Sequence, residues 1–255
     1  MIRAFDARKI REAEAPLLAA GVPLMERASG ALALAVLRLL GGSYGRRALA
    51  LVGRGNNGGD ALFAAAFLAR RGMGVAAVVA EGAHEAGLAA ARAAGCAVLD
   101  VADFDAVARE AARADVWIDG ILGIGARGGL RGPFASLVER LEGSREGSAR
   151  LPAGRSAGAG PLVVAVDVPS GIGTDDGAAP GPILRADLTV TMGAPKPGLF
   201  LDPARRHAGR VETADIGLGL SAAGCAAPDD ADIDAGLPSP DLVSIERADL
   251  PLLWP

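Results

Sequence analysis

Residues 47–60 read RALALVGRGNNGGD and contain the pattern that determines the fold. Ala48 to Val52 form a continuous apolar run, which is typical of a strand buried on both faces of a sheet. Four glycines follow within the next seven residues, and a helical apolar pattern begins after Asp60. A buried strand, a glycine-rich turn and a helix in this order indicate one unit of a parallel α/β sheet.

The same alternation continues along the chain on either side of this unit. We expect further strands at 74–80, 96–99, 115–118, 161–166, 187–192 and 210–214, and helices at 60–71, 84–94, 103–113 and 133–142. Two amphipathic helices, 6–19 and 23–40, come before the first strand. The sequence therefore predicts an α/β protein with a Rossmann-like, doubly wound, mostly parallel sheet, helices on both faces and two N-terminal helices.

Composition narrows the class of protein. The net charge of −4 gives no basic surface for nucleic acid. The most apolar helical run, 31–40, has about half the length of a membrane span and contains Arg38, and residues 1–14 lack the apolar stretch of a signal peptide. Cys96 and Cys225 form neither a metal nor a disulfide pattern. We therefore expect a soluble cytoplasmic protein without a membrane partner.

The first glycine-rich loop, 53–60, is expected at the carboxyl end of its strand, where open parallel sheets bind ligands. Glycine leaves the backbone N–H groups accessible, and such groups beside a helix N-terminus can bind a phosphate group. The loop lacks both the dinucleotide fingerprint and the P-loop lysine, so a plain tight turn with Asp60 as helix cap is the alternative. Asn56 and Asn57 are the only asparagines in the chain, which favours a functional role.

Three other segments are expected at the same sheet edge. Residues 119–133 contain six glycines and two arginines, which indicates a second anion site or else an exposed loop. Asp167 leaves a buried strand just before the Pro169-Ser170-Gly171 turn, where it would be catalytic or only a turn former. Lys196, one of two lysines among 26 cationic residues, follows the strand 187–192 and is either a site residue or a solvated loop residue.

Together these segments resemble one known family, the NAD(P)H-hydrate epimerases (the YjeF N-terminal-domain family), over roughly residues 5–218. Six segments carry the resemblance: Glu12-Ala13-Glu14 with 23–28 (PLMERA), 55–60 (GNNGGD), Ile118-Asp119 with Gly123-Ile124-Gly125, 167–171 (DVPSG), 189–191 (TVT) with Pro195-Lys196, and Asp215-Ile216-Gly217. One such motif would be weak evidence, whereas six in the family's order are strong evidence.

The resemblance implies that the R and S hydrates of NADH and NADPH are interconverted, so that a separate or fused dehydratase specific for S can recover all of the cofactor. It implies that Asp167 lies at the reactive end of the substrate, and that Asn57, Asp119 and Ser170 hold a potassium ion with the help of backbone carbonyls. From their expected positions at the sheet edge, we predict Asp167 as the catalytic acid–base residue and Lys196 as its electrostatic partner. The resemblance implies that the substrate is bound by Asn56, Asn57, Gly58, Gly59, Asp60, Gly123, Ile124, Gly125, Ala126, Arg127, Gly128, Gly129 and Asp167. Ile124 and Ala61 depart from the Thr and Gly that are common in the family.

The domain organisation follows from the same comparison. We expect the epimerase domain at 1–218, an irregular tail or linker at 219–255, and an inserted surface loop at 143–160. A homodimer is among the assemblies that the sequence allows. Residues 240–255 resemble the entrance to the dehydratase half of two-domain members, so we expect this chain by itself to lack ATP- or ADP-dependent dehydration.

Two other classes of function compete with the epimerase. The stronger is a non-catalytic binding or scaffold module on the same fold, since such a module needs the sheet but not every site residue. The presence of Asn57, Asp119, Asp167, Ser170 and Lys196 together favours the enzyme. A conventional dehydrogenase is disfavoured because the dinucleotide fingerprint is absent.

Overall fold

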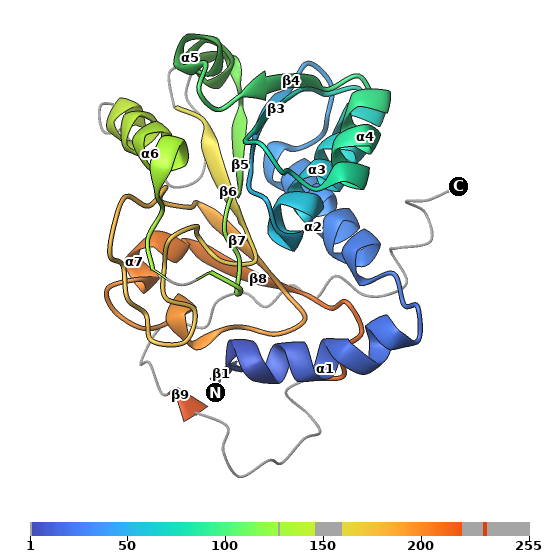
Figure 1. The fold of residues 1–255 in the computed structure, drawn as a ribbon, viewed down its shortest axis with the longest axis vertical. Coiled ribbons are helices and arrows are strands. Elements are labelled where there is room, and N and C mark those ends of the chain that lie inside the picture. Colours follow the sequence, from blue (N-terminus) through green and yellow to red (C-terminus); the bar gives the residue numbers. More distant parts are fainter. Residues whose placement is uncertain (1, 127, 146–159, 221–231, 234–255) are drawn as a thin grey trace.

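The computed structural model describes residues 2–126, 128–145, 160–220 and 232–233 and contains a seven-stranded parallel sheet (Figure 1). The strand order is β4-β3-β2-β5-β6-β7-β8, and every neighbouring pair is parallel. The strands are β2 (Arg47–Val52), β3 (Gly74–Val79), β4 (Ala97–Asp100), β5 (Val116–Gly120), β6 (Leu162–Val166), β7 (Leu188–Met192) and β8 (Arg210–Ala214). The order reverses between β2 and β5, so the carboxyl ends of these two strands form the topological switch point of a doubly wound sheet.

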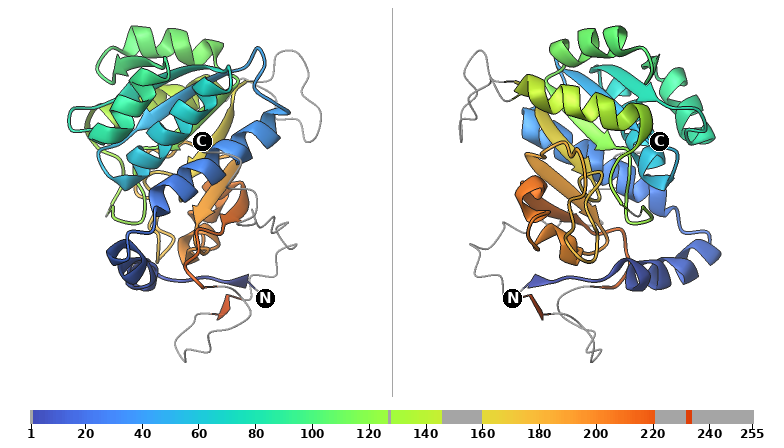
Figure 2. Two further views of the ribbon diagram at one scale, coloured as in Figure 1. Left: turned by 90° about the vertical axis from the view of Figure 1, so that its right-hand side faces the viewer. Right: turned by 60° about the vertical axis from the view of Figure 1, so that its left-hand side comes forward.

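Helices cover both faces of the sheet, as the apolar runs predicted (Figures 1 and 2). One face packs on α2 (Leu24–Leu40), α3 (Asn56–Arg70) and α4 (Glu85–Ala93). The other packs on α5 (Phe104–Arg113) and α6 (Gly132–Arg145). Successive residues of a strand point to opposite faces of the sheet and so belong to different hydrophobic cores. In β2, Ala48 and Ala50 face α2 and α3, whereas Leu49 and Leu51 face the α5–α6 side.

The N-terminal helix α1 (Ala7–Ala19) lies across the lower end of the sheet in Figure 1 and not against either face. Its first turn is capped by the Asp6 carboxylate, which accepts from the Lys9 backbone N–H at 2.7 Å. The Ala7 backbone N–H donates to Asp175 at 2.9 Å, and buried Ile10 packs with Phe5 and Ala194. These contacts hold α1 beside the segments that follow β6 and β7.

Four short elements complete the described fold. A 3-10 turn, η1 (Pro197–Leu199), follows β7, and α7 (Arg205–Ala208) precedes β8. The strands β1 (Ile2–Arg3) and β9 (Asp232–Ile233) pair antiparallel in a separate two-stranded sheet. None of these four was predicted, because two to four residues carry too little periodicity to be recognised.

Two predicted boundaries need correction. The helix expected at 60–71 begins at Asn56, so the asparagines and glycines of the presumed loop form its first turn. The surface loop expected at 143–160 is helical up to Arg145, because α6 is longer than predicted, and 146–159 lie outside the described residues. In the expected irregular tail, 219–255, residues 221–231 and 234–255 also lie outside them, while Asp232–Ile233 form β9.

In the part of the chain that the structure describes, no single helix is long and apolar enough to cross a membrane. Helices α1 and α2 pass that test only as a pair, and they are bent by 117° at their junction.

The switch point supplies a test of the fold, because backbones approach closely there. A Cβ atom on Gly53 would lie 1.8 Å from the Ile121 carbonyl oxygen, whereas a Cβ on Gly55 would meet nothing within 4 Å. We expect Gly53→Ala to lower the free energy of unfolding by about 1–3 kcal/mol or more. The matched Gly55→Ala should cost less than about 1 kcal/mol. Urea denaturation of both variants measures the difference, and equal stability would contradict the close approach.

Candidate active site

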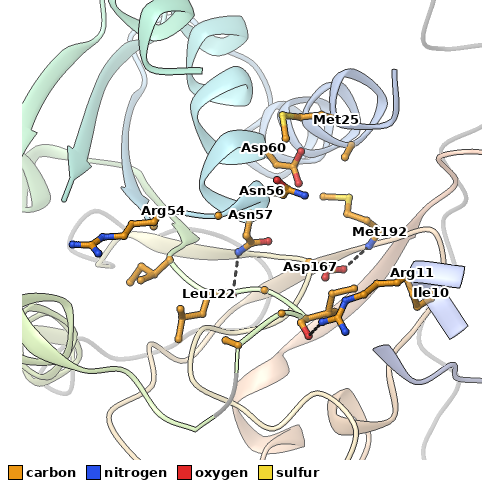
Figure 3. A pocket seen from close by; sticks show the side chains of 18 of the residues that line it. Ile10, Arg11, Met25, Arg54, Asn56, Asn57, Asp60, Leu122, Asp167 and Met192 are labelled. Atoms are coloured by element: carbon orange, nitrogen blue, oxygen red, sulfur yellow. Dashed lines mark hydrogen bonds between the residues drawn. The ribbon is translucent and has the colours of Figure 1, made fainter. Parts of the chain in front are cut away.

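A cavity of about 830 Å³ opens at the carboxyl ends of the central strands (Figure 3). Its walls come from the segments that follow β2, β5, β6 and β7, and from helices α1 and α2. This is the place where an open parallel sheet is expected to bind ligands. All four segments that the sequence singled out therefore meet in one cavity.

The segment after β2 contributes Asn56, Asn57 and Asp60 to the cavity wall. Gly58 and Gly59 are buried behind it: a Cβ on Gly58 would lie 2.0 Å from the Gly53 carbonyl oxygen, and Gly59 packs against Met25 and His84. These glycines are needed for packing at the start of α3. Their expected contact with substrate stays a prediction.

The segment after β5 forms the opposite wall. Gly123, Ile124, Gly125, Ala126 and Gly129 line the cavity. Gly128 does not line it, and Arg127 lies outside the described residues. Arg11 of α1 donates to the Ile124 carbonyl at 2.9 Å, so the N-terminal helix closes this side of the cavity (Figure 3).

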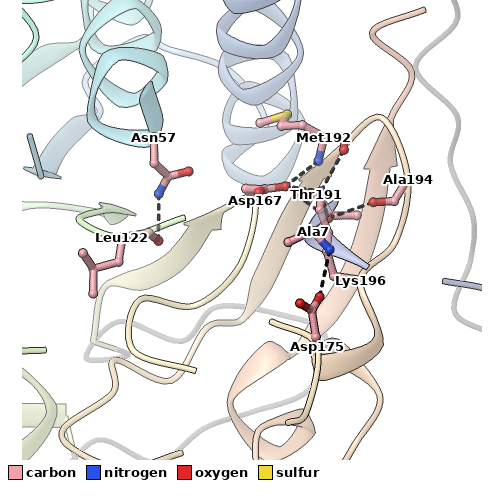
Figure 4. Close-up of polar contacts among 9 residues, drawn as sticks. All are labelled: Ala7, Asn57, Leu122, Asp167, Asp175, Thr191, Met192, Ala194 and Lys196. Atoms are coloured by element: carbon pink, nitrogen blue, oxygen red, sulfur yellow. Dashed lines mark hydrogen bonds and ion pairs between the residues drawn. The ribbon is translucent and has the colours of Figure 1, made fainter. Parts of the chain in front are cut away.

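Asp167, directly after β6, has an unusual backbone. Its φ is +66°, a left-handed conformation that residues other than glycine rarely adopt and that costs of order 1–3 kcal/mol. The carboxylate is 7% exposed and accepts from the Met192 backbone N–H at 3.0 Å. It also forms an ion pair with Lys196 (Figure 4). These partners hold the side chain at the cavity wall.

Lys196 is fully buried, which an ammonium group tolerates only when it is paired and hydrogen-bonded. Besides the Asp167 carboxylate, it donates to the Thr191 hydroxyl at 3.0 Å and to the Met192 carbonyl at 2.8 Å. These three acceptors satisfy all three of its protons. The alternative of a solvated loop lysine is therefore wrong.

Two more carboxyl groups face the same cavity. Burial raises the pKa of Asp60 well above its usual value, and the negative charges of Asp167 and Glu14 raise it further, while Lys196 opposes them. Burial also raises the pKa of Glu14, on α1, against the opposing charge of Lys196. Glu14 stood in a recognised motif but received no role, because sequence spacing cannot show that α1 turns this residue towards the cavity.

The residues expected to hold a cation are linked below the cavity through the backbone of Leu122. Asp119 is fully buried and accepts from the Ser170 backbone N–H at 2.8 Å and from the Ser170 hydroxyl at 2.6 Å. The Leu122 N–H donates to the Ser170 hydroxyl at 2.8 Å, and the Asn57 amide donates to the Leu122 carbonyl at 3.0 Å (Figure 4). Asn57, Asp119 and Ser170 thus form one connected group.

The electrostatics of this group fit a cation. Burial raises the pKa of Asp119 although hydrogen bonds from Ser170 and Ile121 oppose the shift, and within the described ranges no basic side chain pairs with it. The donors around it are hard oxygens, from a carboxylate, a hydroxyl, an amide and backbone carbonyls, which suit an alkali or alkaline-earth ion. Among the described residues there is no group of three or more His, Cys, Asp or Glu that could hold another metal.

Comparison with known proteins agrees with this architecture. Residues 21–198 match the family described as YjeF-related protein N-terminus. The chain is 48% identical to the NAD(P)H-hydrate epimerase of Clavibacter michiganensis over 223 residues, which cover 86% of this chain and 92% of the relative. It is 40% identical to the bifunctional NAD(P)H-hydrate repair enzyme Nnr of Mycobacterium tuberculosis, covering 98% of this chain and 46% of that protein.

Among solved structures, the fold is similar to the crystal structure of the yeast protein YNL200c. The TM-score is 0.65 at 21% sequence identity, and the match covers 89% of this chain and 98% of the yeast chain. This likeness confirms the Rossmann-like α/β fold that the sequence predicted.

The buried ion pair leads to a prediction about stability. Lys196→Met would leave the Asp167 carboxylate buried without its cation, and we expect a loss of about 3–5 kcal/mol in the free energy of unfolding. Adding Asp167→Asn should restore part of that loss, because no unpaired charge remains. Arg8→Met, which breaks the exposed Arg8–Glu12 pair, is the control and should change stability by less than about 0.5 kcal/mol. Equal effects of Lys196→Met and Arg8→Met in urea denaturation would contradict the assignment.

Proposed function

This chain belongs to the YjeF-related N-terminal family, and on that premise we propose that it is an NAD(P)H-hydrate epimerase, an isomerase that interconverts the R and S hydrates of NADH and NADPH. The observation that carries the proposal is the position of Asp167, an ion-paired carboxylate in a strained backbone conformation at the wall of the cavity. Strain and a buried charge are costly, and they are typical of residues retained for chemistry.

The opposite end of the cavity suits the phosphates of a dinucleotide. Helix α3 begins in the cavity wall with Gly55 as its N-cap, and the first N–H groups of a helix have no partner within it. Arg54 and Arg131 also line the cavity. Its volume lies within the range of about 300–1,000 Å³ that is usual for small-molecule sites.

The reaction needs proton transfer. Ring carbon 6 of the hydrate bears a hydroxyl group and is bonded to the ring nitrogen, so inverting it requires loss and return of water or opening and closure of the ring. Either route moves a proton on and off oxygen or nitrogen, which is general acid–base work. We assign that work to Asp167, with Lys196 as the positioning residue that pairs with its carboxylate and orients it.

We further propose that Asn57, Asp119 and Ser170 hold a potassium ion with the help of backbone carbonyls. The support is the buried Asp119 carboxylate, which lacks a basic partner among the described residues. A weakly held monovalent ion would offset both this charge and the substrate phosphates without strict geometry. In this arrangement Asp119 and Ser170 position the loop at Leu122 on which the substrate lies.

The remaining expectations concern the cellular setting. A dehydratase that consumes the S hydrate is the expected partner, and the bifunctional relative from Mycobacterium tuberculosis is named a repair enzyme that combines activities. The cytoplasmic location and the homodimer stay predictions.

The central test is Asp167→Asn, which keeps the shape of the side chain and removes its capacity to accept and return a proton. We expect equilibration of purified R and S hydrates to slow by about 10²- to 10⁴-fold. Binding of NADPH should change little, because the phosphate end of the cavity is untouched. Asp105→Asn, an exposed position on α5, is the matched control and should keep the wild-type rate. A near-normal rate for Asp167→Asn would refute the assignment, and no turnover by the wild type would favour the scaffold alternative.

The cation is tested by linkage between ion binding and stability. If potassium binds the folded chain, the melting temperature should be higher in KCl than in choline chloride at equal ionic strength. Asp119→Asn keeps the shape but removes the charge, and we expect it to abolish this difference and any dependence of the rate on potassium. Because a proton competes with the ion for Asp119, the effect in the wild type should weaken as the pH falls. Persistence of the full potassium effect in Asp119→Asn would rule out this site.

A further inference from the structure

Asp60 lines the cavity but has no part in the acid–base step or the cation site proposed above. Its side chain is only 9% exposed and lines the cavity, and its Oδ1 atom has no hydrogen-bond partner among the described residues. If the carboxylate were ionised, its buried Oδ1 atom would have no hydrogen bond among the described residues, which is unfavourable. A neutral carboxylic acid has a smaller cost, and it carries a proton that can be given to a ligand.

The charged neighbours of Asp60 favour the neutral form. Asp167 and Glu14 both raise its pKa, and Lys196, which would lower it, is already paired with Asp167. His84 packs against the adjacent Gly59, but its Nδ1 accepts from the Gly87 N–H at 3.1 Å. A neutral carboxylic acid beside an ion-paired carboxylate is a common acid–base arrangement in enzymes.

The two carboxyl groups reach the cavity from different elements. Figure 3 shows Asp60 on α3 and Asp167 after β6, and both side chains line the same cavity. A substrate ring bound in this cavity can therefore meet a proton donor from one element and a proton acceptor from the other. Inverting one carbon requires chemistry on both faces of the ring.

From this geometry we propose that Asp60 is the proton donor of the epimerase and works opposite Asp167, the proton acceptor; the inference rests on the proposed function. Asp60 gives its proton to the hydroxyl oxygen on carbon 6 as the C–O bond breaks. The bonding pair leaves with the water formed, and the ring nitrogen lone pair forms a C=N bond. A water then adds to the opposite face: its oxygen forms the new C–O bond, the C=N pair returns to nitrogen, and Asp167 accepts the released proton.

This step is balanced and needs no oxidant or reductant. One water leaves and one water adds, and the proton lost by Asp60 equals the proton gained by Asp167. In the reverse direction the two groups exchange tasks, so one pair serves both hydrates. Exchange with solvent restores the starting protonation.

The experiment compares the wild type with Asp60→Asn, Asp60→Glu and the control Asp105→Asn, using purified R and S hydrates of NADPH. We expect Asp60→Asn to slow equilibration by about 10²- to 10⁴-fold and Asp60→Glu to recover part of the rate. The wild-type rate should fall as the pH rises through the pKa of Asp60, because the donor is then ionised. The residual activity of Asp60→Asn should lack that fall.

Thermal unfolding separates this role from a structural one. The pKa of Asp60 is raised from its usual 3.8 in the folded chain, so the folded state binds more protons than the unfolded state between these two values. Wild-type stability is therefore lost as the pH rises across this window. Asp60→Asn should not share the loss, so its melting temperature relative to the wild type should increase with pH. A purely structural Asp60 predicts an inactive variant that is less stable at every pH.

The outcomes distinguish the two proposals. If the wild type does not equilibrate the hydrates, the proposed function fails, and the donor role fails with it. If the wild type is active and Asp60→Asn is nearly as fast, only the donor role is overturned. If Asp60→Asn does not fold, the wild type and Asp60→Glu decide: both rates must fall as the pH rises, and the pH of that fall must differ between them. A rate that does not fall at alkaline pH overturns the proposal.

Discussion

The buried ion pair between Lys196 and Asp167 is the interaction on which the site depends. Lys196 follows β7 and Asp167 follows β6, so the pair joins the ends of two neighbouring strands at the cavity wall. It keeps an aspartate in a left-handed backbone conformation and satisfies a lysine that has no access to water. The energetic cost of the strained backbone and the buried charges is offset by further hydrogen bonds. The Lys196 ammonium donates to the Thr191 hydroxyl and the Met192 carbonyl, and the Asp167 carboxylate accepts from the Met192 N–H.

Three buried aspartates at this sheet edge differ in what surrounds them. Asp167 is paired with the Lys196 ammonium, and Asp119 has hydrogen-bond donors but no basic partner among the described residues. Asp60 has one oxygen, Oδ1, for which the described residues supply no hydrogen-bond partner. The same residue type is therefore suited to three tasks: accepting a proton, attracting a metal cation and donating a proton. The charges of Asp167 and Lys196 act on Asp60 in opposite directions, so these groups at the cavity wall are electrostatically coupled.

Much of this architecture was predictable from the sequence. Apolar runs separated by amphipathic stretches determine a parallel sheet, because only strands buried on both faces read in this way. Once the sheet is parallel, the segments that begin at Gly53, Asp119, Asp167 and Met192 must meet at its carboxyl edge. Unusual residue usage also singled out residues that line the cavity: Asn56 and Asn57 are the only asparagines of the chain, and Lys196 is one of its two lysines.

Only the tertiary structure decided how each of these residues is surrounded. Glu14 reaches the cavity because α1 is held across the sheet edge, through contacts of Ala7 and Arg11 with segments more than a hundred residues away. Gly58 and Gly59 were predicted as ligand contacts, and the structure adds that both pack at the start of α3, against Gly53 and His84 respectively. The sequence by itself determined the sheet and the order of its loops, because these follow from local periodicity, and the candidate residues came from its motifs and from the family resemblance. Burial, hydrogen-bond partners and the protonation of Asp60 depend on side chains from distant segments, so only their packing together could determine them.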